Sequence, residues 1–287
     1  MEKKRKKKQS RLSEIWRRLK KNKLSMVSLF VIIFVLLIAL FAPLLAPYEY
    51  QLQNSKRALE GPSRDHLLGT DRLGRDILSR LLYGSRQSLQ MGFTAVVVAA
   101  VLGITVGSIA GYYGGWTDNL IMRFLDIYQG IPMFLLTVTL ASVLGPSLRN
   151  AIIAIGISMI PGNARFMRAC ILSVREQEYI EAAKMINASD GRIIRGHIIP
   201  NAIAPMIVNI TMGLGFSVLA GAGLSFIGLG VQPPIPEWGG MIADARNFMR
   251  SNPQLAYYPG LCIMITVLAF NLLGDGLRDA LDPRLKV

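Results

Sequence analysis

The sequence predicts an all-α integral membrane protein that crosses the bilayer six times. Of its 287 residues, 52% are hydrophobic, and they are gathered into long runs. A helix needs about 20 predominantly apolar residues to span the hydrocarbon core, and six runs are candidates. The hydrophilic segments between them differ in Lys and Arg content, as expected for loops on opposite sides of a membrane. The predicted spans are residues 24–46, 89–113, 120–144, 149–172, 202–227 and 259–273.

The N-terminal segment, residues 1–23, is strongly basic. It contains twelve Lys or Arg residues and two Glu, so we expect a cytoplasmic tail beside anionic lipid. The net charge of +14 would also suit a nucleic-acid-binding protein. Aromatic residues are not interleaved with the basic ones, however, and membrane orientation explains the charge better. We expect no nucleic-acid partner.

The first apolar run, residues 24–46, follows this basic tail, a combination that also describes a signal peptide. The run is too long for a signal peptide, lacks an Ala-x-Ala cleavage site and precedes further spans. We therefore predict an uncleaved span that begins a single transmembrane domain, residues 24–287.

The distribution of basic residues predicts that both termini lie in the cytoplasm. In that orientation the inner segments hold 22 Lys or Arg residues and the outer segments hold 10, which agrees with the positive-inside rule. The first outer loop, residues 47–88, is an exception with seven basic residues. Five acidic residues of the same loop could pair with them. In the second outer loop, residues 231–258, the segment QPPIPEW contains three prolines that forbid a helix there.

Several positions inside the spans predict how the helices pack or bend. The second span carries small residues four apart, which let helices approach closely in lipid. They are Gly103, Gly107 and Gly111. Pro132 is expected to kink the third span, and Pro161 with Gly162 to interrupt the fourth. Arg123 and Asp126, three residues apart, are expected to pair near the inner end of the third span.

The polar segment 173–201 lies between two spans, so it must lie in water beside the membrane. The residues from Glu181 onward are strong helix formers, and Asn187 suits a left-handed turn. Ser189 and Asp190 are residue types that favour N-caps, and Pro200 is expected to end the segment. We predict a helix, a sharp turn and a second short helix. The apolar face of the second helix is formed by Ile193, Ile194, His197 and Ile198. From spacing alone, an ordinary cytoplasmic loop is the alternative.

This segment resembles the Glu-Ala-Ala motif of permease subunits in binding-protein-dependent ABC importers. The motif reads Glu-Ala-Ala, three residues, Gly, nine residues, Ile, one residue, Leu-Pro. The matching residues are Glu181, Ala182, Ala183 and Pro200. Asn187 stands where Gly is usual and retains the turn, while His197 and Ile199 replace Ile and Leu. The resemblance implies a loop that docks into a groove on a cytoplasmic ATPase and carries its motion to the membrane helices. The residues predicted for this coupling loop are Glu181, Ala182, Ala183, Asn187, Ala188, Asp190, His197, Ile199 and Pro200.

The first outer loop contains a second motif, HLLGTDRLGRD, followed by SR and GSRQSL. It resembles the first outer loop of permeases from dipeptide, oligopeptide and nickel importers. The motif residues are His66, Gly69, Thr70, Asp71, Gly74, Arg75 and Asp76. We interpret them as a structural loop rather than a metal or catalytic site, because no second histidine is predicted on this side. The segments FIGLGVQPPIPEWG and FNLLGDGLRDALDPR resemble the second permease type of that group.

The sequence lacks the motifs of an ATPase, a metalloprotease or a serine hydrolase. It has no GxxxxGK[ST], HExxH, CxxC or GxSxG. The two histidines are predicted on opposite sides of the membrane, and Cys170 and Cys262 are expected to be inert thiols in apolar stretches. We therefore expect no cofactor, no metal and no enzymatic activity in this chain, with ATP hydrolysis on a separate subunit.

The resemblance implies the type I permease fold of ABC importers and a multi-pass protein of a prokaryotic cell membrane. The implied partners are a second, homologous permease, two cytoplasmic ATP-binding subunits and an extracellular solute-binding protein. The implied solute is a dipeptide or oligopeptide, with nickel and sugars left open. One alternative is an ATP-independent secondary transporter or channel, for which Asn209 and Asn271 are the candidate polar residues within the spans. Another is an intramembrane enzyme, for which no nucleophile and base pair is present.

Overall fold

The computed structural model describes residues 11–281. In that range the chain is helical, and its one β-type contact is an isolated bridge between Thr70 and Asp76. The α-helices are α1 (Arg11–Lys21), α2 (Lys23–Leu45), α3 (Ile77–Tyr113), α4 (Gly115–Gln129), α5 (Met133–Leu144), α6 (Leu148–Arg175), α7 (Glu178–Met185), α8 (Asp190–Ile193), α9 (Ile199–Phe226), α10 (Trp238–Ala245) and α11 (Gln254–Leu281). Two short 3-10 helices, η1 (Ser55–Arg57) and η3 (Arg246–Phe248), and the π-helical η2 (Ile194–Ile198) complete the set. The predicted all-α fold is confirmed, while residues 1–10 of the predicted tail and residues 282–287 lie outside the described range.

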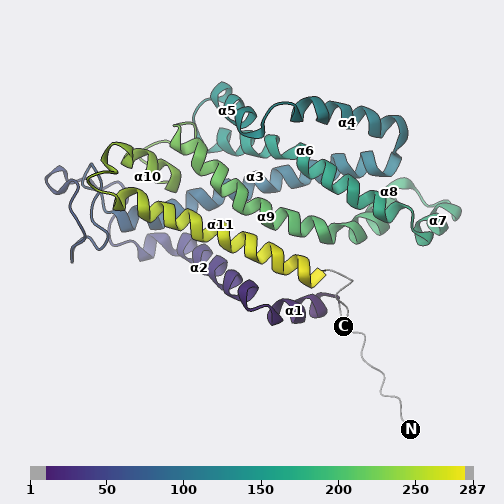
Figure 1. Cartoon of the computed structure of the whole chain (residues 1–287), viewed down its shortest axis with the longest axis horizontal. Helices are drawn as coiled ribbons and strands as arrows, with labels where there is room; N and C mark the ends of the chain where they lie inside the picture. The colour runs from purple at the N-terminus through teal and green to yellow at the C-terminus, as the bar shows by residue number, and fades with distance from the viewer. Residues whose placement is uncertain (1–10, 282–287) are drawn as a thin grey trace, which may run out of the picture.

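The long helices run alongside one another and leave connecting segments at two ends (Figure 1). The segment between α2 and α3 lies at one end together with α10. α7 and α8 lie at the other end, toward which α1 and the C-terminal end of α11 also lie. The two predicted loop motifs are therefore at opposite ends of the molecule.

Within residues 11–281, four helical stretches are long and apolar enough to cross a membrane. They are α2, α3, the continuous stretch Asp190–Phe226 and α11. α4 and α5 qualify only as a pair, with a bend of 82° between them, which is the geometry of a broken span or of a re-entrant loop. α6, which corresponds to the fourth predicted span, does not qualify although it has 28 residues. α6 carries Arg165 and Arg168 and packs along α3 and against α5 and α9, so much of its surface faces protein rather than lipid.

Proline positions differ from the prediction in two places. Pro161 lies inside α6, which is continuous from Leu148 to Arg175. Membrane helices tolerate proline because neighbouring groups satisfy the freed carbonyl. Pro200 lies in the first turn of α9 and does not end the preceding helix, since a residue in a first turn needs no N–H donor. Pro132 does stand at a break, between α4 and α5.

α3 begins at Ile77, twelve residues before the predicted second span. The polar residues that suggested a loop there, including Ser79, Arg80 and Ser88, are buried against protein. The N-cap is Asp76, whose Oδ2 accepts a hydrogen bond from the N–H of Ser79 at 2.7 Å. The polar residues at the start of α3 therefore contact other segments of the chain rather than lipid. Because hydropathy detects only apolar runs, it placed the start of this helix too far along the sequence.

α3 and α6 approach closely along the predicted glycine positions. A Cβ on Gly103 would lie 2.5 Å from the Cβ of Asn163, and one on Gly107 would lie 2.3 Å from the carbonyl oxygen of Ala164. These distances are too short for any side chain. The small-residue face predicted for the second span therefore packs directly on the backbone of α6.

Ion pairs connect α4 to α6, and their partners differ from the prediction. Asp126 pairs with Arg165 across the two helices, and Arg123 is exposed. Asp118 accepts two hydrogen bonds from the Arg168 guanidinium. The predicted pair of Arg123 and Asp126 is wrong because the neighbouring helix supplies the better-placed cation.

The basic tail contains the helix α1, which the sequence analysis did not predict. Its Leu19 is buried and belongs, with Ile15, to an apolar cluster that includes Leu277 and Ala280 of α11. Asn22 follows α1 and caps α2, accepting a hydrogen bond from the Ser25 N–H at 3.2 Å. The N-terminal end of the first span is thus fixed against the last helix.

Candidate functional site

The predicted coupling loop forms two short helices joined by a left-handed residue. Asn187, between α7 and α8, has a φ of +58°, as the sequence predicted. The N–H of Asn187 donates to the carbonyl of Lys184 at 2.9 Å, and that of Ala188 donates to the carbonyl of Ala183 at 3.2 Å. Gly and Asn adopt this conformation at the lowest cost. Asn187 therefore reverses the chain at the end of α7.

One side of this loop is buried against the long helices. Ile180 and Ala183 of α7 and Ile193 and Ile198 beyond the turn pack in one apolar cluster. The cluster also contains Met167 and Ile171 of α6, Tyr112 of α3, and Ala202 and Met206 of α9. The loop is thus anchored on three long helices.

His197 is exposed and does not belong to this buried face. The prediction that it does is wrong, because residues 194–198 form a π-helix. The wider π-helical turn bonds residues five apart, which puts Ile193 and Ile198 on the same face. Ile199 is partly buried and Pro200 is exposed. The departure of His197 from the usual Ile therefore costs no apolar contact.

A polar contact fixes the loop to the end of α3. The Tyr112 hydroxyl donates to Asp190 Oδ1 at 2.6 Å, and Lys184 Nζ lies 5.8 Å from the centroid of the Tyr112 ring. Arg175, at the end of α6, donates to the carbonyl of Gly111 at 3.0 Å. Ser189 occupies the N-cap position of α8, but its side chain makes no capping hydrogen bond. Of the two residues predicted as N-caps, Asp190 instead accepts the hydrogen bond from Tyr112 of α3.

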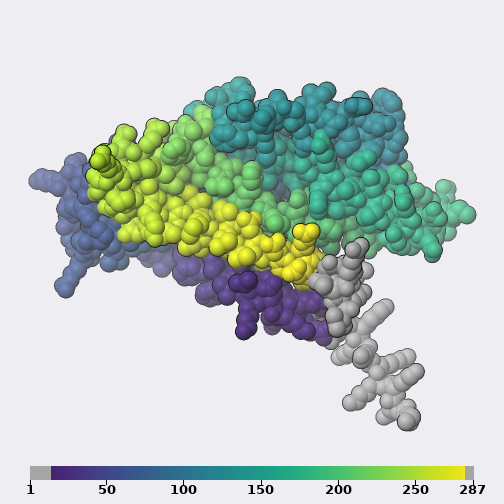
Figure 2. Space-filling view, in the orientation of Figure 1, coloured from purple at the N-terminus to yellow at the C-terminus, as the bar shows by residue number. Residues whose placement is uncertain are grey.

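The other side of the loop is uncovered. Glu181 and Ala182 are exposed, and Glu181 makes no ion pair within residues 11–281. At the tip, Met185 and Ile186 are 88% and 80% exposed. Figure 2 shows the α7–α8 region projecting at one end of the molecule. The loop thus combines a buried anchoring side with an apolar, exposed tip.

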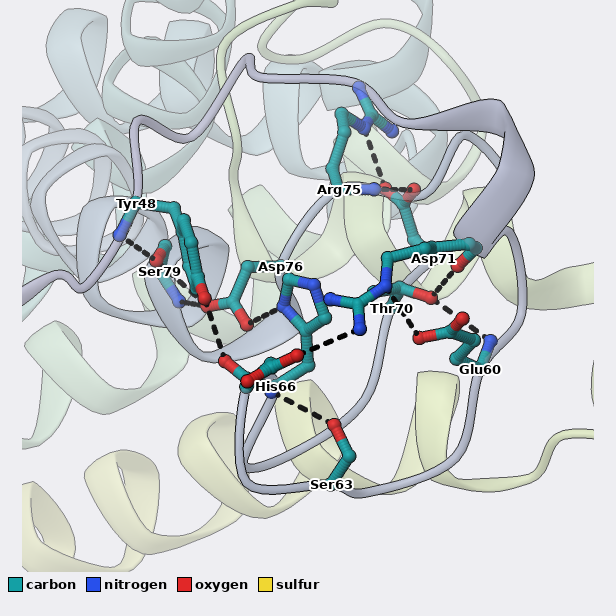
Figure 3. Close-up of polar contacts among 11 residues, drawn as sticks. Tyr48, Glu60, Ser63, His66, Thr70, Asp71, Arg75, Asp76 and Ser79 are labelled. Atoms are coloured by element: carbon teal, nitrogen blue, oxygen red, sulfur yellow. Dashed lines mark hydrogen bonds and ion pairs between the residues drawn. The ribbon is translucent and has the colours of Figure 1, made fainter.

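In the outer loop, His66 and Asp76 are buried against each other (Figure 3). His66 Nδ1 lies 2.9 Å from Asp76 Oδ1. Asp76 Oδ2 accepts hydrogen bonds from the N–H and the hydroxyl of Ser79 at 2.7 and 2.8 Å. The Tyr48 ring lies beside the imidazole, with 4.9 Å between centroids. The pair therefore joins the outer loop to the start of α3.

Asp71 organises the turn that follows. Its Oδ1 accepts from the N–H groups of Leu73 and Arg75 at 2.8 and 3.0 Å, and its Oδ2 accepts from Arg75 Nε at 2.6 Å. The buried Arg75 also reaches Asp244 of α10 at 3.3 Å, and Arg72 reaches the same carboxylate at 3.4 Å. These pairs connect the outer loop to the second outer segment.

Gly69 and Gly74 have φ values of +82° and +70°. A Cβ on Gly74 would lie 1.9 Å from the carbonyl oxygen of Asn54, and one on Gly69 would lie 2.4 Å from that of Glu60. Between them, Thr70 Oγ1 accepts from the N–H of Glu60 at 3.0 Å. The motif residues thus determine the backbone path of the loop, which supports the structural interpretation.

The exposed edge of the outer loop carries a further pair, Arg57 and Asp65, with 2.7 Å between Nη2 and Oδ2. The hydrogen bond from Arg57 holds the pKa of the Asp65 carboxyl below its usual value. Within residues 11–281 no group of three or more His, Cys, Asp or Glu side chains is arranged to hold a metal ion. The imidazole of His66, the histidine of the motif, already contacts the Asp76 carboxylate.

Comparison with known proteins decides the family. Residues 103–287 match the family described as binding-protein-dependent transport system inner membrane component. The chain belongs to this family. Residues 10–62 of the permease also match the N-terminal TM domain of oligopeptide transport permease C.

The permease is similar along nearly its whole length to characterised relatives. It is 50% identical over 273 residues to the dipeptide transport system permease protein DppC of Alkalihalophilus pseudofirmus, covering 95% of the permease and 90% of the relative. It is 43% identical over 274 residues to the glutathione transport system permease protein GsiD of Pectobacterium atrosepticum, covering 95% and 91%.

Solved structures show the same fold. A structure of the inward-facing MetNI methionine ABC transporter matches with a TM-score of 0.59 and 21% identity, over 71% of the permease and 97% of that chain. A crystal structure of an amino acid ABC transporter with histidines matches with a TM-score of 0.55 and 16% identity, over 69% and 92%. The predicted fold of an ABC importer permease is confirmed.

Sequence reasoning missed several residues that stabilise the end of the permease opposite the α7–α8 loop (Figure 1). Glu237, 1% exposed, caps α10 through the N–H of Gly240 at 2.9 Å and accepts from the hydroxyl of Ser88 at 2.7 Å. Trp238 Nε1 donates to the carbonyl of Leu81 at 3.1 Å. The three prolines in this loop do exclude a helix over themselves, but α10 begins directly after them. The acidic Glu237 before Trp-Gly-Gly was the available signal, because carboxylates favour N-caps.

Proposed function

We propose that this permease forms half of the translocation path of an ATP-driven importer of dipeptides or oligopeptides. The observation that carries the proposal is its 50% identity, over 95% of its length, to a dipeptide transport system permease protein. The buried and exposed sides of the α7–α8 loop add a structural argument, because such a loop suits the contact with a separate ATPase.

In the proposed mechanism, the exposed side of the coupling loop docks on a cytoplasmic ATPase. Met185 and Ile186 supply apolar contact area, and Glu181 supplies a negative charge. Ala182 lets the ATPase approach closely because its side chain is small. Beyond the turn, residues Asp190–Phe226 form one helical stretch, so a displacement of the loop is carried directly into α9. ATP binding closes the ATPases and opens the path outward, and hydrolysis returns it to the inward-facing form.

The proposed assembly contains a second, homologous permease, two ATP-binding subunits and an extracellular solute-binding protein. The permease has no GxxxxGK[ST] motif, so ATP hydrolysis belongs to the ATP-binding subunits. α4 and α5 carry exposed apolar residues such as Phe124, Ile127 and Phe134, which lipid or the second permease would cover. The outer loop and α10 form the end that faces the solute-binding protein.

The proposed location is the cell membrane of a prokaryote, with both termini in the cytoplasm. The count of 22 basic residues in inner segments against 10 in outer segments supports this orientation. α1 and α7 lie toward the same end of the molecule (Figure 1), as the orientation requires.

A pull-down of the tagged permease in mild detergent, followed by mass spectrometry, tests the assembly. We expect a second permease and ATPases with phosphate loops. Uptake of labelled peptide into liposomes that contain the purified complex should then require internal ATP hydrolysis and the solute-binding protein. Recovery of this chain alone, with uptake that survives ATP depletion and collapses with an uncoupler, would instead establish a secondary transporter.

A further inference from the structure

A cavity of about 600 Å³ lies at the elbow between α4 and α5. Its other walls come from α3, α6 and α9. Sites for small ligands in proteins enclose roughly 300–1,000 Å³, so the cavity is large enough for one or two amino-acid residues. Two of its lining residues lie near the middle of neighbouring helices: Asn163 on α6 and Asn209 on α9.

The polar groups of this cavity are all uncharged. The polar residues that line it are Tyr128, Gln129, Ser158, Asn163 and Asn209. Among residues 11–281, no Lys, Arg, His, Asp or Glu lines it. The remaining wall is apolar and includes Phe166 and Phe216. The set contains none of the imidazole or thiolate ligands that suit transition metals such as nickel.

Some of these groups have hydrogen-bonding capacity to spare. The Tyr128 hydroxyl is buried and has no partner in the described chain. Within residues 11–281 the exposed Gln129 amide makes no side-chain hydrogen bond. The Asn209–Asn163 pair uses one of the four N–H donors and one of the four acceptor lone pairs that the two amides offer. Pro132, which follows the end of α4, has no N–H to donate to the carbonyl of Tyr128. A buried group without a partner, such as the Tyr128 hydroxyl, is costly unless a ligand satisfies it.

We propose that this cavity is a transit site that binds the backbone amide groups of the transported peptide, through Tyr128, Gln129, Asn163 and Asn209. The inference rests on the proposed import function. Uncharged donors and acceptors match the N–H and C=O groups that every peptide shares, and they do not discriminate among side chains. The absence of fixed charge keeps binding weak enough for release, as conduction requires.

Replacing one neutral group by a charge tests the site, because the site should then discriminate between charged peptides. Gln129→Glu keeps the size of the side chain and breaks no contact. In liposomes that contain the complete transporter, we expect the uptake ratio of Ala-Lys to Ala-Glu to rise about fivefold over wild type, the scale of a partly screened charge interaction. Gln129→Lys should shift the ratio in the opposite direction.

The matched control is Asn119→Asp, which makes the same amide-to-carboxylate change at an exposed position of α4 outside the cavity. It should leave the ratio unchanged. Equal ratios in the wild type and both Gln129 variants, with uptake retained, would refute the site while leaving the import function intact. A shift in the control as large as that in Gln129→Glu would also refute it. If the wild-type complex takes up neither peptide with ATP, the import function fails, and the site with it.

Discussion

At the scale of single residues, Asp76 accepts hydrogen bonds from Ser79 and contacts the buried His66. Asp76→Ala removes the N-cap of α3 and leaves His66 without its partner. We expect a loss of about 2–4 kcal/mol in stability, measured as a lower midpoint of thermal unfolding in detergent. Asp65→Ala is the control in the same loop, because its ion pair is exposed and its loss should leave the unfolding midpoint close to that of the wild type. Equal midpoints for the two variants would contradict the structural role of Asp76.

A second prediction at this scale concerns Asn187, because its φ of +58° is costly for most residues other than Gly and Asn. Asn187→Gly, the residue usual in the family motif, should retain the turn and full coupling of ATP hydrolysis to uptake. Asn187→Val should strain the turn by about 1–2 kcal/mol or more and lower the uptake per ATP hydrolysed. Full coupling in the valine variant would show that the reversal between α7 and α8 does not depend on this residue.

At the scale of helices, the exposed tip of α7 should determine contact with the ATPase. Met185→Asp places a charge where apolar area is expected to be buried, so retention of the ATPase subunits in a pull-down should fall about tenfold. Leu52→Asp, at another exposed apolar residue in the outer loop, should leave retention unchanged. Undiminished retention with Met185→Asp would exclude the tip as a docking surface.

The contact of α3 with α6 gives a prediction of the opposite kind, in which a larger side chain destabilises. A Cβ on Gly107 would lie 2.3 Å from the carbonyl oxygen of Ala164, whereas one on Gly260 of α11 meets no atom within 4 Å. Gly107→Ala should therefore cost about 1–3 kcal/mol, while Gly260→Ala should be neutral or stabilise by up to about 1 kcal/mol. Thermal unfolding of the two alanine variants provides the comparison. A Gly107 variant as stable as the Gly260 variant would mean that the helices separate at no cost.

The helices also show what the sequence could predict. Long apolar runs predicted helices such as α2 and α9, and the Gly-x-x-x-Gly spacing predicted the close face of α3, because both depend on local composition. The start of α3, the partner of Asp126 and the exposure of His197 could not be predicted in that way. Each depends on a contact with another helix or on the π-helical turn at residues 194–198, which hydropathy and spacing do not encode.

For the whole molecule, the predicted orientation requires the coupling loop and the outer loop to lie on opposite sides of the membrane. Cysteine labelling tests this requirement with single cysteines placed before and after α2. The native Cys170 and Cys262 are first replaced by alanine. Leu52→Cys should react with a membrane-impermeant maleimide in intact spheroplasts, whereas Lys21→Cys should react only after permeabilisation. Both positions are exposed in the structure, so a difference in labelling reports the side of the membrane rather than burial. The reverse pattern would place α7 and α8 outside the cell, where no ATPase could reach them, and the proposed coupling would fail.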